Sequence, residues 1–357
     1  NKMQAFNAFV LLSGAATATA AGAQRSPLPP SAYVLGAAKS GSTSLFDTLL
    51  QHPDVCRNKV LKGEPAFAFK EIHFWGEGTY QEKFQGWNRY LKHFQECNAT
   101  QLRIEGTPNY LNELEAPSDM VKLYKEKGFT NLDHLRFVAI LREPTSRAYS
   151  LYEHTKRHTE DKWHFYADRP FQVLVKEEIG WWNDCNRDYR RNTTAMATQT
   201  VWEYCRFVTG AFFPGMYSYQ LRHWFKFFKP EQFKVFTLDQ YMNRWPEVRV
   251  VLSEHLGLRE YPDMAPTLSN TGKYEQPDFP RELYDLYTPV NRDLAKLVSE
   301  YPDVFFGSDV AEGADPETNA FFKNFLTFAP RVGRVNLTKH DHLQRSNAKN
   351  VLEPTHV

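Results

Sequence analysis

The sequence lacks three features that would point to common functional classes: excess charge of one sign, closely spaced metal ligands and a long apolar run. Its 357 residues carry a formal net charge of +1, so no global field would recruit nucleic acid, and any anion site must be local. Histidine, cysteine and carboxylate residues show no tight spacing typical of a metal site. Aromatic residues make up 15% of the chain, which argues against disorder and favours a dense core with a cleft for carbohydrate or ring ligands.

The first 30 residues differ in composition from the rest of the chain. Residues 5–23 are small and apolar, but the strongly apolar part is shorter than the roughly 20 residues that a membrane span needs. It is similar to the apolar region and small-residue cleavage zone of a signal peptide, or to a weak signal anchor. A disordered alanine-rich leader is the alternative. We therefore assign residues 1–30 to a leader or anchor with a linker.

Cysteines and glycosylation sequons bear on the compartment. The chain has four cysteines, and it has sequons at Asn98, Asn192 and Asn336. Together with the leader, these features favour the secretory lumen, where disulfides persist, and we expect a Golgi protein, either secreted or membrane-anchored. We predict a disulfide between Cys185 and Cys205, because a loop of that size closes easily on a helical segment.

A candidate phosphate-binding loop lies within residues 33–50, YVLGAAKSGSTSLFDTLL. A short apolar run predicts a strand, small residues at 39–43 predict a turn, and a helix is expected to follow. Such a strand–turn–helix unit is an anion cradle, in which Gly41 lets the backbone approach and Lys39 adds charge. The nucleotide-triphosphatase motif G-x-x-x-x-G-K-[ST] is absent, since Ser42 follows the second glycine. The loop therefore predicts a phosphorylated ligand other than ATP.

Strands and helices alternate along the chain. The best strand, 135–141, runs into Arg142 and then into a helix at 148–157; further strands are expected at 102–105 and 230–238. Amphipathic spacing predicts further helices at 42–51, 80–94, 117–127, 215–228, 245–256 and 280–299. This alternation predicts an α/β fold with a P-loop-like parallel β-sheet flanked by helices on both faces. Because ligands bind at the carboxyl ends of such strands, Lys39 and Arg142 should lie on one edge of the sheet.

Arg142 indicates a second anion site. A guanidinium group grips phosphate with two hydrogen bonds, and Ser150 on the next helix can add a donor. The alternative is a structural ion pair between Arg142 and Glu143 or Glu153. Two anion sites on one sheet edge suit a ligand with phosphate groups at both ends.

Five motifs follow one another along the chain: KSGST at 39–43, KEIHFW at 70–75, EGTPNY at 105–110, LREPTSRAYSLY at 141–152 and LYDLYTPVNRDL at 283–294. In this order they resemble the carbohydrate sulfotransferases of the Golgi, which use 3′-phosphoadenosine 5′-phosphosulfate (PAPS), over residues 31–306. The chain also resembles heparan sulfate sulfotransferases. Gly-Met-Tyr at 215–217 and the cysteine-bearing insert before it are similar to N-acetylgalactosamine 4-sulfate 6-O-sulfotransferases, which act on sulfated galactosaminoglycans.

The resemblance implies a donor site in two parts. The phosphosulfate end would bind the loop, and the 3′-phosphate would bind Arg142 and Ser150. Lys273 occupies the position of a late loop that closes over the donor in the family. The residues implied for the phosphosulfate end are Lys39, Ser40, Gly41, Ser42, Thr43 and Ser44.

The resemblance also implies a catalytic base. Sulfuryl transfer removes a proton from the acceptor hydroxyl while charge develops on the bridging oxygen of the donor. Glu71 matches the family's base, and a nearby aromatic pair could raise its pKa, while Lys39 would stabilise the leaving oxygen. His73 is the rival base, because on an extended segment residues two apart share a face. The sulfuryl group carries less charge than a phosphoryl group, so we expect no metal requirement.

The residues that would contact the acceptor are less well defined by the sequence than those of the donor site. Lys70, His73 and Tyr217 are the implied acceptor contacts, and basic residues at 187, 190 and 191 are further candidates for a polyanionic acceptor. Gly106 stands where several heparan sulfate enzymes have lysine, so heparan specificity does not transfer directly. We expect an anionic polysaccharide acceptor and no nucleic acid partner.

The prediction is a lumenal PAPS-dependent sulfotransferase with its catalytic domain at 31–306. Residues 159–213 would form a helical and loop insert for the acceptor, and residues 307–357 a polar tail without an assigned fold. The alternatives are the same chemistry on a tyrosyl peptide or small alcohol, a P-loop kinase or nucleotide-binding protein, and a catalytically silent lectin-like protein.

Overall fold

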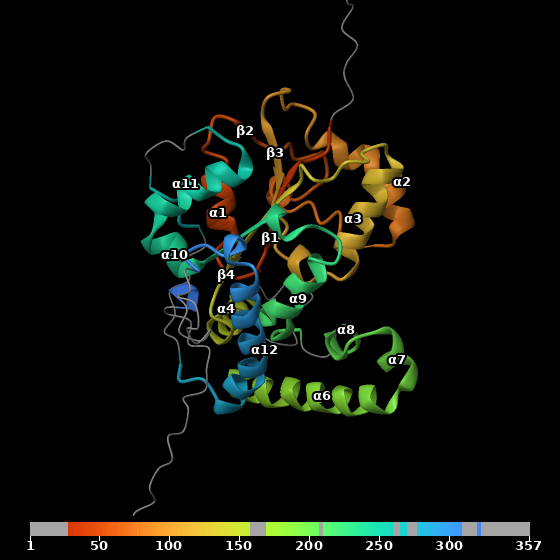
Figure 1. Ribbon diagram of the computed structural model, residues 1–357, viewed down its shortest axis with the longest axis vertical. Helices are drawn as coiled ribbons and strands as arrows, with labels where there is room; N and C mark the ends of the chain where they lie inside the picture. The colour runs from red at the N-terminus through yellow and green to blue at the C-terminus, as the bar shows by residue number, and fades with distance from the viewer. Residues whose placement is uncertain are drawn as a thin grey trace, which may run out of the picture.

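A computed structural model describes residues 28–76, 78–157, 169–206, 210–259, 265–269, 277–308 and 320–322 (Figure 1). Its centre is a five-stranded parallel sheet in the order β2-β3-β1-β4-β5. The strands are β1 (Ala32–Gly36), β2 (Val55–Cys56), β3 (Leu102–Glu105), β4 (Arg136–Leu141) and β5 (Phe233–Thr237). The predicted strands are confirmed, and β2 is the one that the sequence analysis missed.

Both faces of the sheet are covered, as continuous apolar strands require. Alternate residues of β1 enter different cores. Tyr33 and Leu35 pack with α2 (Tyr80–Lys92), α3 (Glu115–Glu126), α9 (Tyr217–Trp224) and α12 (Arg281–Glu300). Val34 packs with α1 (Ser42–Leu49), α10 (Leu238–Asn243) and α11 (Trp245–Leu256). Figure 1 shows α2 and α3 on one side of β1 and β4 and α1, α10 and α11 on the other. The predicted fold class, a P-loop-like parallel sheet flanked by helices on both faces, is confirmed.

The helices that position the site follow the predicted periodicity with shifted ends, except α10, which the sequence did not predict. They are α1 (Ser42–Leu49), α2 (Tyr80–Lys92), α3 (Glu115–Glu126), α4 (Pro144–Arg157), α9 (Tyr217–Trp224), α10 (Leu238–Asn243), α11 (Trp245–Leu256) and α12 (Arg281–Glu300). The largest shifts are in α9, which ends four residues earlier than expected, and in α4, which begins four residues earlier, with Pro144 in its first turn. Proline is favoured there because the first-turn amide has no partner within the helix.

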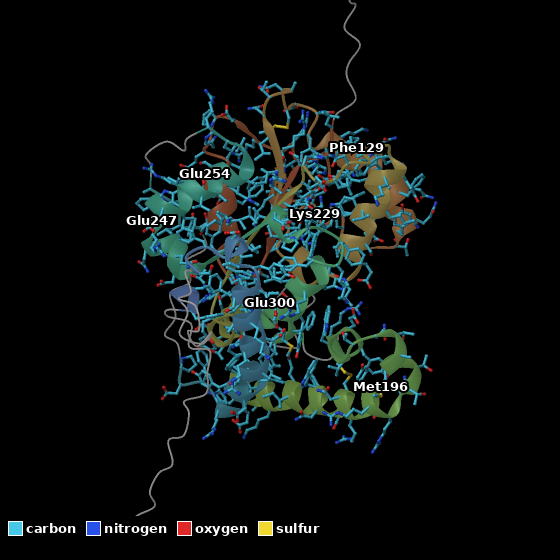
Figure 2. The ribbon with its side chains drawn as sticks, in the orientation of Figure 1. Phe129, Met196, Lys229, Glu247, Glu254 and Glu300 are labelled. Carbon is cyan, nitrogen blue, oxygen red and sulfur yellow. A yellow bond between two sulfur atoms is a disulfide. The ribbon has the colours of Figure 1, made fainter. Side chains whose placement is uncertain are left out.

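In the part of the insert that the structure describes, three helices precede α9: α6 (Phe171–Arg191), α7 (Thr193–Thr198) and α8 (Val201–Cys205). Figure 1 shows them beside α12 at one end of the molecule. The predicted disulfide between Cys185 and Cys205 is present and ties α6 to α8. A second disulfide joins Cys56 of β2 to Cys97 after α2; both appear as yellow bonds in Figure 2.

The ends of the chain bear on the predicted domain limits. Residues 1–27, 309–319 and 323–357 lie outside the described residues, so the leader and most of the tail stay predictions. The described part of the tail corrects the expectation of an unassigned polar segment, because Phe321 and Phe322 are buried in the core, with Phe321 against Phe305. Within the described ranges, no helix is long and apolar enough to cross a bilayer.

Candidate active site

The loop between β1 and α1 has a backbone built for an anion. Lys39 adopts a left-handed conformation with φ of 66°, and Gly41 caps α1 with φ of 94°. A Cβ at Gly41 would also lie 2.8 Å from Leu238 Cδ1, so both conformation and space favour glycine. Gly41 supplies no capping side chain, which leaves the first-turn amides of α1 to a ligand. Ser40 and Ser42 are buried in this loop and first turn.

Positive charge converges on this loop. Burial and the charges of Arg157, Arg142 and Lys70 together lower the pKa of Lys39 to about 8, although Glu71 acts to raise it. The Arg142 side chain donates to the Lys39 carbonyl at 3.5 Å, a long contact. Four cations around one carboxylate form a site that a multiply charged anion would neutralise. The predicted convergence of Lys39 and Arg142 on one edge of the sheet is therefore what the structure has.

Arg157 is the member of this group that the sequence analysis missed. It lies at the C-terminal end of α4, fifteen positions after Arg142, and its charge is the second largest influence on the Lys39 pKa. Basic residues in the last turn of a helix usually serve the helix dipole, so their presence does not identify a ligand site. Spacing along the chain gave no reason to pair Arg157 with Lys39.

Glu71 lies between a lysine and a histidine. Lys70 Nζ is 2.7 Å from Glu71 Oε1 and donates to Thr43 Oγ1 at 3.0 Å, and His73 Nε2 is 3.5 Å from Glu71 Oε2. Burial acts to raise the pKa of Glu71, but the His73 hydrogen bond and the Lys70 charge outweigh it and hold the pKa below its usual value. The expectation that aromatic shielding raises this pKa is therefore wrong, and Glu71 is ionised at neutral pH.

The sequence predicts an extended segment for Glu71 and His73, but in the structure this segment is not extended. A short 3-10 helix, η1 (Ala66–Phe69), precedes it, and His73 is left-handed with φ of 55°. Glu71 and His73 meet because the chain turns at His73, which brings the two side chains to the same place. Lys70 is buried, with its side chain 3% exposed, so the structure does not present it to an acceptor as predicted.

The second anion site follows β4. Glu143 accepts from the Thr145 amide at 3.0 Å and the Ser146 amide at 2.7 Å, so its carboxylate caps α4. Glu153 lies 3.7 Å from Lys156 within α4. These contacts do not favour the alternative in which either glutamate is the structural partner of Arg142.

Two other residues that the sequence predicts for the site, Ser150 and Tyr217, are buried. Ser150 is buried on α4, on the helix that Glu143 caps. Tyr217 is fully buried and donates to the Arg142 carbonyl at 2.8 Å. Tyr217 therefore fixes the Arg142 backbone, and the structure does not place it as an acceptor contact.

Ser44 holds a distant segment instead of facing the loop. Its hydroxyl donates to the Ser269 carbonyl at 3.2 Å and accepts from the Ser269 amide at 2.9 Å. Thr48 accepts from the Thr267 amide at 2.8 Å, so α1 anchors residues 265–269. Lys273, the predicted late-loop contact, lies outside the described residues.

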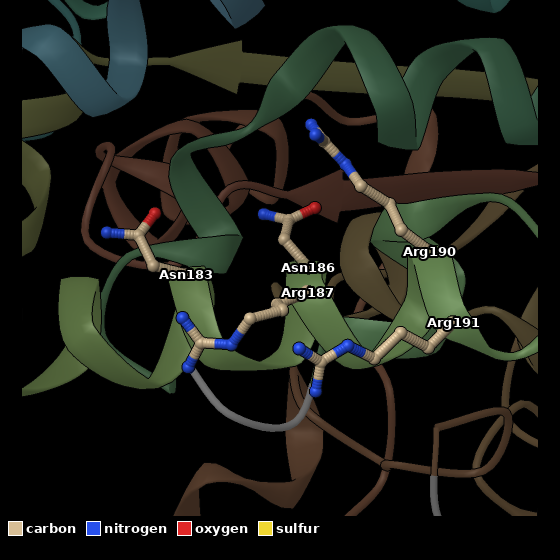
Figure 3. A pocket seen from close by; sticks show the side chains of 5 residues that line it. All are labelled: Asn183, Asn186, Arg187, Arg190 and Arg191. Carbon is tan, nitrogen blue, oxygen red and sulfur yellow. The ribbon is translucent and has the colours of Figure 1, made fainter.

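A basic face on α6 forms an open groove of about 450 Å³ lined by Asn183, Asn186, Arg187, Arg190 and Arg191 (Figure 3). Arg187 pairs with Asp184, whereas Arg190 and Arg191 are exposed. The three arginines that the sequence analysis named for a polyanion therefore share one surface.

Gly106 is fixed by packing. A Cβ at this position would lie 2.5 Å from Cδ2 of Phe46, which is fully buried in α1. A lysine side chain here requires Phe46 to move, so the cation found in several heparan sulfate enzymes has no space in this chain.

Known proteins with similar sequences and folds identify the family of this chain. The family model for the sulfotransferase domain matches residues 29–260, and the chain therefore belongs to the sulfotransferase family. It is 25% identical over 233 residues to a bifunctional heparan sulfate N-deacetylase/N-sulfotransferase 1 of Caenorhabditis elegans, covering 65% of this chain and 22% of that protein. It is 27% identical over 223 residues to heparan sulfate glucosamine 3-O-sulfotransferase 5 of Homo sapiens, covering 62% and 52%.

The chain thus spans about a fifth to a half of the length of these curated relatives. Among solved structures, a sulfotransferase from Alicyclobacillus acidocaldarius superposes with a TM-score of 0.52 at 21% identity, covering 76% of this chain and 96% of that one. At that identity the likeness shows the fold alone.

Proposed function

We propose that this chain transfers the sulfuryl group of PAPS to a carbohydrate hydroxyl, with Glu71 as general base. The observation that carries the proposal is the ionised Glu71 beside a cluster of cations at the anion loop. The reaction needs a base that accepts a proton and a cation that stabilises the leaving oxygen. Glu71 and Lys39 are neighbouring groups suited to these two roles.

The residues fit the donor at both ends. The first-turn amides of α1 and Lys39 suit the 5′-phosphosulfate, and Arg142 with Ser150 suits the 3′-phosphate. In the reaction, the acceptor oxygen bonds to sulfur while the bond from sulfur to the bridging oxygen breaks. The proton of the acceptor hydroxyl passes to Glu71, and the charge left on the bridging oxygen is stabilised by Lys39.

The low pKa of Glu71 suits this role once the donor is bound. The carboxylate is ready to accept a proton at neutral pH, and the arriving phosphosulfate adds negative charge that raises its pKa and its basicity. Lys70, which bridges Glu71 and Thr43, keeps the base in register with the loop.

The test replaces each candidate base in turn. Glu71→Gln should lower kcat by about 10²- to 10⁴-fold, because the amide cannot accept the proton. Its Kd for adenosine 3′,5′-bisphosphate should stay near that of the wild type, since the donor residues are untouched. His73→Ala is the matched variant and should lose less. An active Glu71→Gln enzyme beside an inactive His73→Ala enzyme would transfer the role to His73.

We further propose an anionic polysaccharide acceptor that extends over the α6 arginine face. Sulfate and carboxylate groups repeated along a polymer match guanidinium groups spaced along a helix. Replacing both Arg190 and Arg191 with Glu should raise KM for a long polysaccharide and leave KM for a short oligosaccharide unchanged. The same reversal at exposed Lys125 on α3, which lies away from α6 in Figure 1, is the control. Equal effects on long and short acceptors would remove α6 from the binding surface.

The two disulfides support a secretory, oxidising compartment for this enzyme, as expected of a Golgi protein.

A further inference from the structure

A fully buried carboxyl group, Glu105, lies at the end of β3 behind the candidate base. Its Oε1 accepts from the hydroxyls of Tyr110 at 2.5 Å and Thr107 at 3.0 Å. Its Oε2 lies 2.6 Å from the Tyr90 hydroxyl. All three partners are hydroxyl groups instead of the cation that a buried carboxylate usually requires.

The hydroxyls beyond Tyr90 form a chain whose protons can be counted. Tyr90 Oη lies 3.2 Å from Tyr33 Oη, which lies 2.6 Å from Tyr124 Oη, and Tyr124 donates to the Pro30 carbonyl at 2.7 Å. Together with the contact between Glu105 and Tyr90, these are four hydrogen bonds in series, each requiring one proton. Three tyrosines supply three protons and a carbonyl supplies none, so a proton in all four contacts, including the long one between Tyr90 and Tyr33, requires Glu105 to supply the fourth.

An ionised Glu105 leaves the series one proton short. Tyr90 would then donate to Glu105, and Tyr33 could donate to Tyr90 or to Tyr124, so two oxygens would face each other without a hydrogen. A neutral acid removes this conflict, because Glu105 donates to Tyr90 and each tyrosine donates to the next. The carbonyl oxygen of the acid, Oε1, still accepts from Tyr110 and Thr107.

The groups that face Glu105 agree with a neutral acid. Burial raises the pKa of Glu105 to about 7, opposed by the hydroxyl hydrogen bonds and by the charge of His73. The pKa values of the surrounding tyrosines are raised by burial, so these tyrosines keep their protons; they are Tyr33 of β1, Tyr90 of α2, Tyr110 of η2 (Tyr110–Asn112) and Tyr124 of α3.

Glu105 also reaches the segment that carries the candidate base. The Tyr110 hydroxyl accepts from the amides of Phe74 at 2.8 Å and Trp75 at 3.2 Å, and the Thr107 hydroxyl accepts from the His73 amide at 3.2 Å. Glu105 therefore orients two hydroxyls that hold three consecutive amides, including that of left-handed His73.

We propose that Glu105 is a neutral carboxylic acid in the working enzyme and acts as a positioning residue for the 71–75 segment. It does not touch substrate: it orients the hydroxyls of Tyr110 and Thr107, and these fix the backbone that carries Glu71 and His73. The positioning role rests on the proposed function, whereas the protonation state does not.

The first experiment reads the proton in the ligand-free protein by infrared spectroscopy. The wild type should show the carbonyl band of an un-ionised carboxylic acid near neutral pH, and Glu105→Gln should lack it. Tyr33→Phe should move the disappearance of this band to lower pH, because removing one hydroxyl leaves a series that an ionised Glu105 can satisfy. Absence of the band in the wild type from pH 5 upward would overturn the proposal.

The second experiment compares melting temperatures against pH. A folded protein that holds a proton at Glu105 which the unfolded chain releases loses stability as pH rises from about 4.5 to about 7. The melting temperature of the wild type should therefore fall across this interval relative to Glu105→Gln, whose amide offers the same acceptor and donor without titrating. A wild type that gains stability relative to Glu105→Gln as pH rises would show a carboxylate.

The third experiment tests positioning through turnover. Thr107→Val, close in shape, removes the support of the His73 amide and should lower kcat between about 10- and 100-fold, with an unchanged Kd for adenosine 3′,5′-bisphosphate. Glu105→Leu should do the same, and Glu105→Gln should recover most of the activity. Loss of activity in Glu105→Gln equal to that in Glu105→Leu would overturn the positioning role. Because the first two experiments need no turnover, failure of the proposed sulfotransferase activity leaves them readable.

Discussion

The chemical role of Lys39 depends on the burial and the charges around it. Its displacement from the nucleotide-triphosphatase position argues against ATP as the ligand, but spacing along the chain could not show which groups the lysine faces. In the folded chain it is desolvated among Arg157, Arg142 and Lys70, and its pKa falls to about 8. A lysine held near the end of its charged range responds strongly to an arriving anion.

Donor binding should therefore be linked to protons at Lys39. Bound phosphate groups favour the charged lysine and raise its pKa, so binding of adenosine 3′,5′-bisphosphate should take up a proton between about pH 8 and 9 and weaken above pH 8. Calorimetry in buffers of different ionisation enthalpy measures this uptake. Lys39→Arg should bind without uptake in that range, because guanidinium stays charged. Uptake that persists in Lys39→Arg would assign the proton to another group.

The same lysine affects the stability of the ligand-free protein. The unfolded chain keeps the Lys39 proton up to about pH 10.5, whereas the folded chain releases it near pH 8, so this group makes stability rise between these values. The contribution is lost as pH falls back through 8. Comparison with Lys39→Met, which does not titrate, isolates this slope.

At the scale of the element, the first turn of α4 is capped by Glu143, the residue that precedes the helix. Glu143 directs both carboxylate oxygens at first-turn amides, and the adjacent Arg142 is held by Tyr217 through its carbonyl. Glu143 thus caps the helix, while Tyr217, from a distant part of the chain, holds the backbone of the adjacent Arg142. The sequence predicts the start of this helix four residues later, and it leaves open whether Glu143 pairs with the arginine or caps the helix.

Removing this cap should affect both folding and donor binding. Glu143→Ala should lower the free energy of unfolding by about 1–2 kcal/mol, measured by urea denaturation, because two amides lose their acceptor. It should also weaken binding of adenosine 3′,5′-bisphosphate, since the start of α4 orients Arg142 and Ser150. Glu153→Ala on the same helix is the control and should cost less than about 1 kcal/mol. Equal losses in the two variants would show that the cap has no special role.

At the scale of the whole molecule, the sequence predicted what depends on local pattern. The continuous apolar runs of β1 and β4 and the amphipathic helices determine an α/β fold, and the family motifs place Lys39 and Arg142 on one edge. It did not predict β2, because two residues carry no periodicity and their place depends on pairing with β3 and on the bond between Cys56 and Cys97.

Contacts between residues far apart in the sequence could not be predicted either. The Ser44–Ser269 contact joins positions 225 residues apart, and the exclusion of a side chain at Gly106 depends on Phe46. The hydroxyl series at Glu105 draws its tyrosines from β1, α2, η2 and α3. Such contacts follow from tertiary packing, and a motif such as EGTPNY shows their location without showing their chemistry.

The two disulfides lie in different parts of the molecule. Cys56–Cys97 secures an edge of the sheet, whereas Cys185–Cys205 secures α6 against α8, at the end of the molecule where Figure 2 labels Met196. Their loops span 41 and 20 residues, so loop-closure entropy assigns them about 4 and about 3 kcal/mol of stabilisation. Similar contributions to stability need not mean similar contributions to function.

Replacing Cys185 and Cys205 with alanine should lower the free energy of unfolding by about 3 kcal/mol and raise KM for a polysaccharide acceptor, since α6 loses its attachment to α8. The Kd for adenosine 3′,5′-bisphosphate should not change, because the donor residues lie on the sheet edge and α4. The matched variant without Cys56 and Cys97 should be destabilised to a similar extent while keeping its KM for the polysaccharide. If both variants change KM alike, the loss reflects general stability, and α6 does not form a separate acceptor surface.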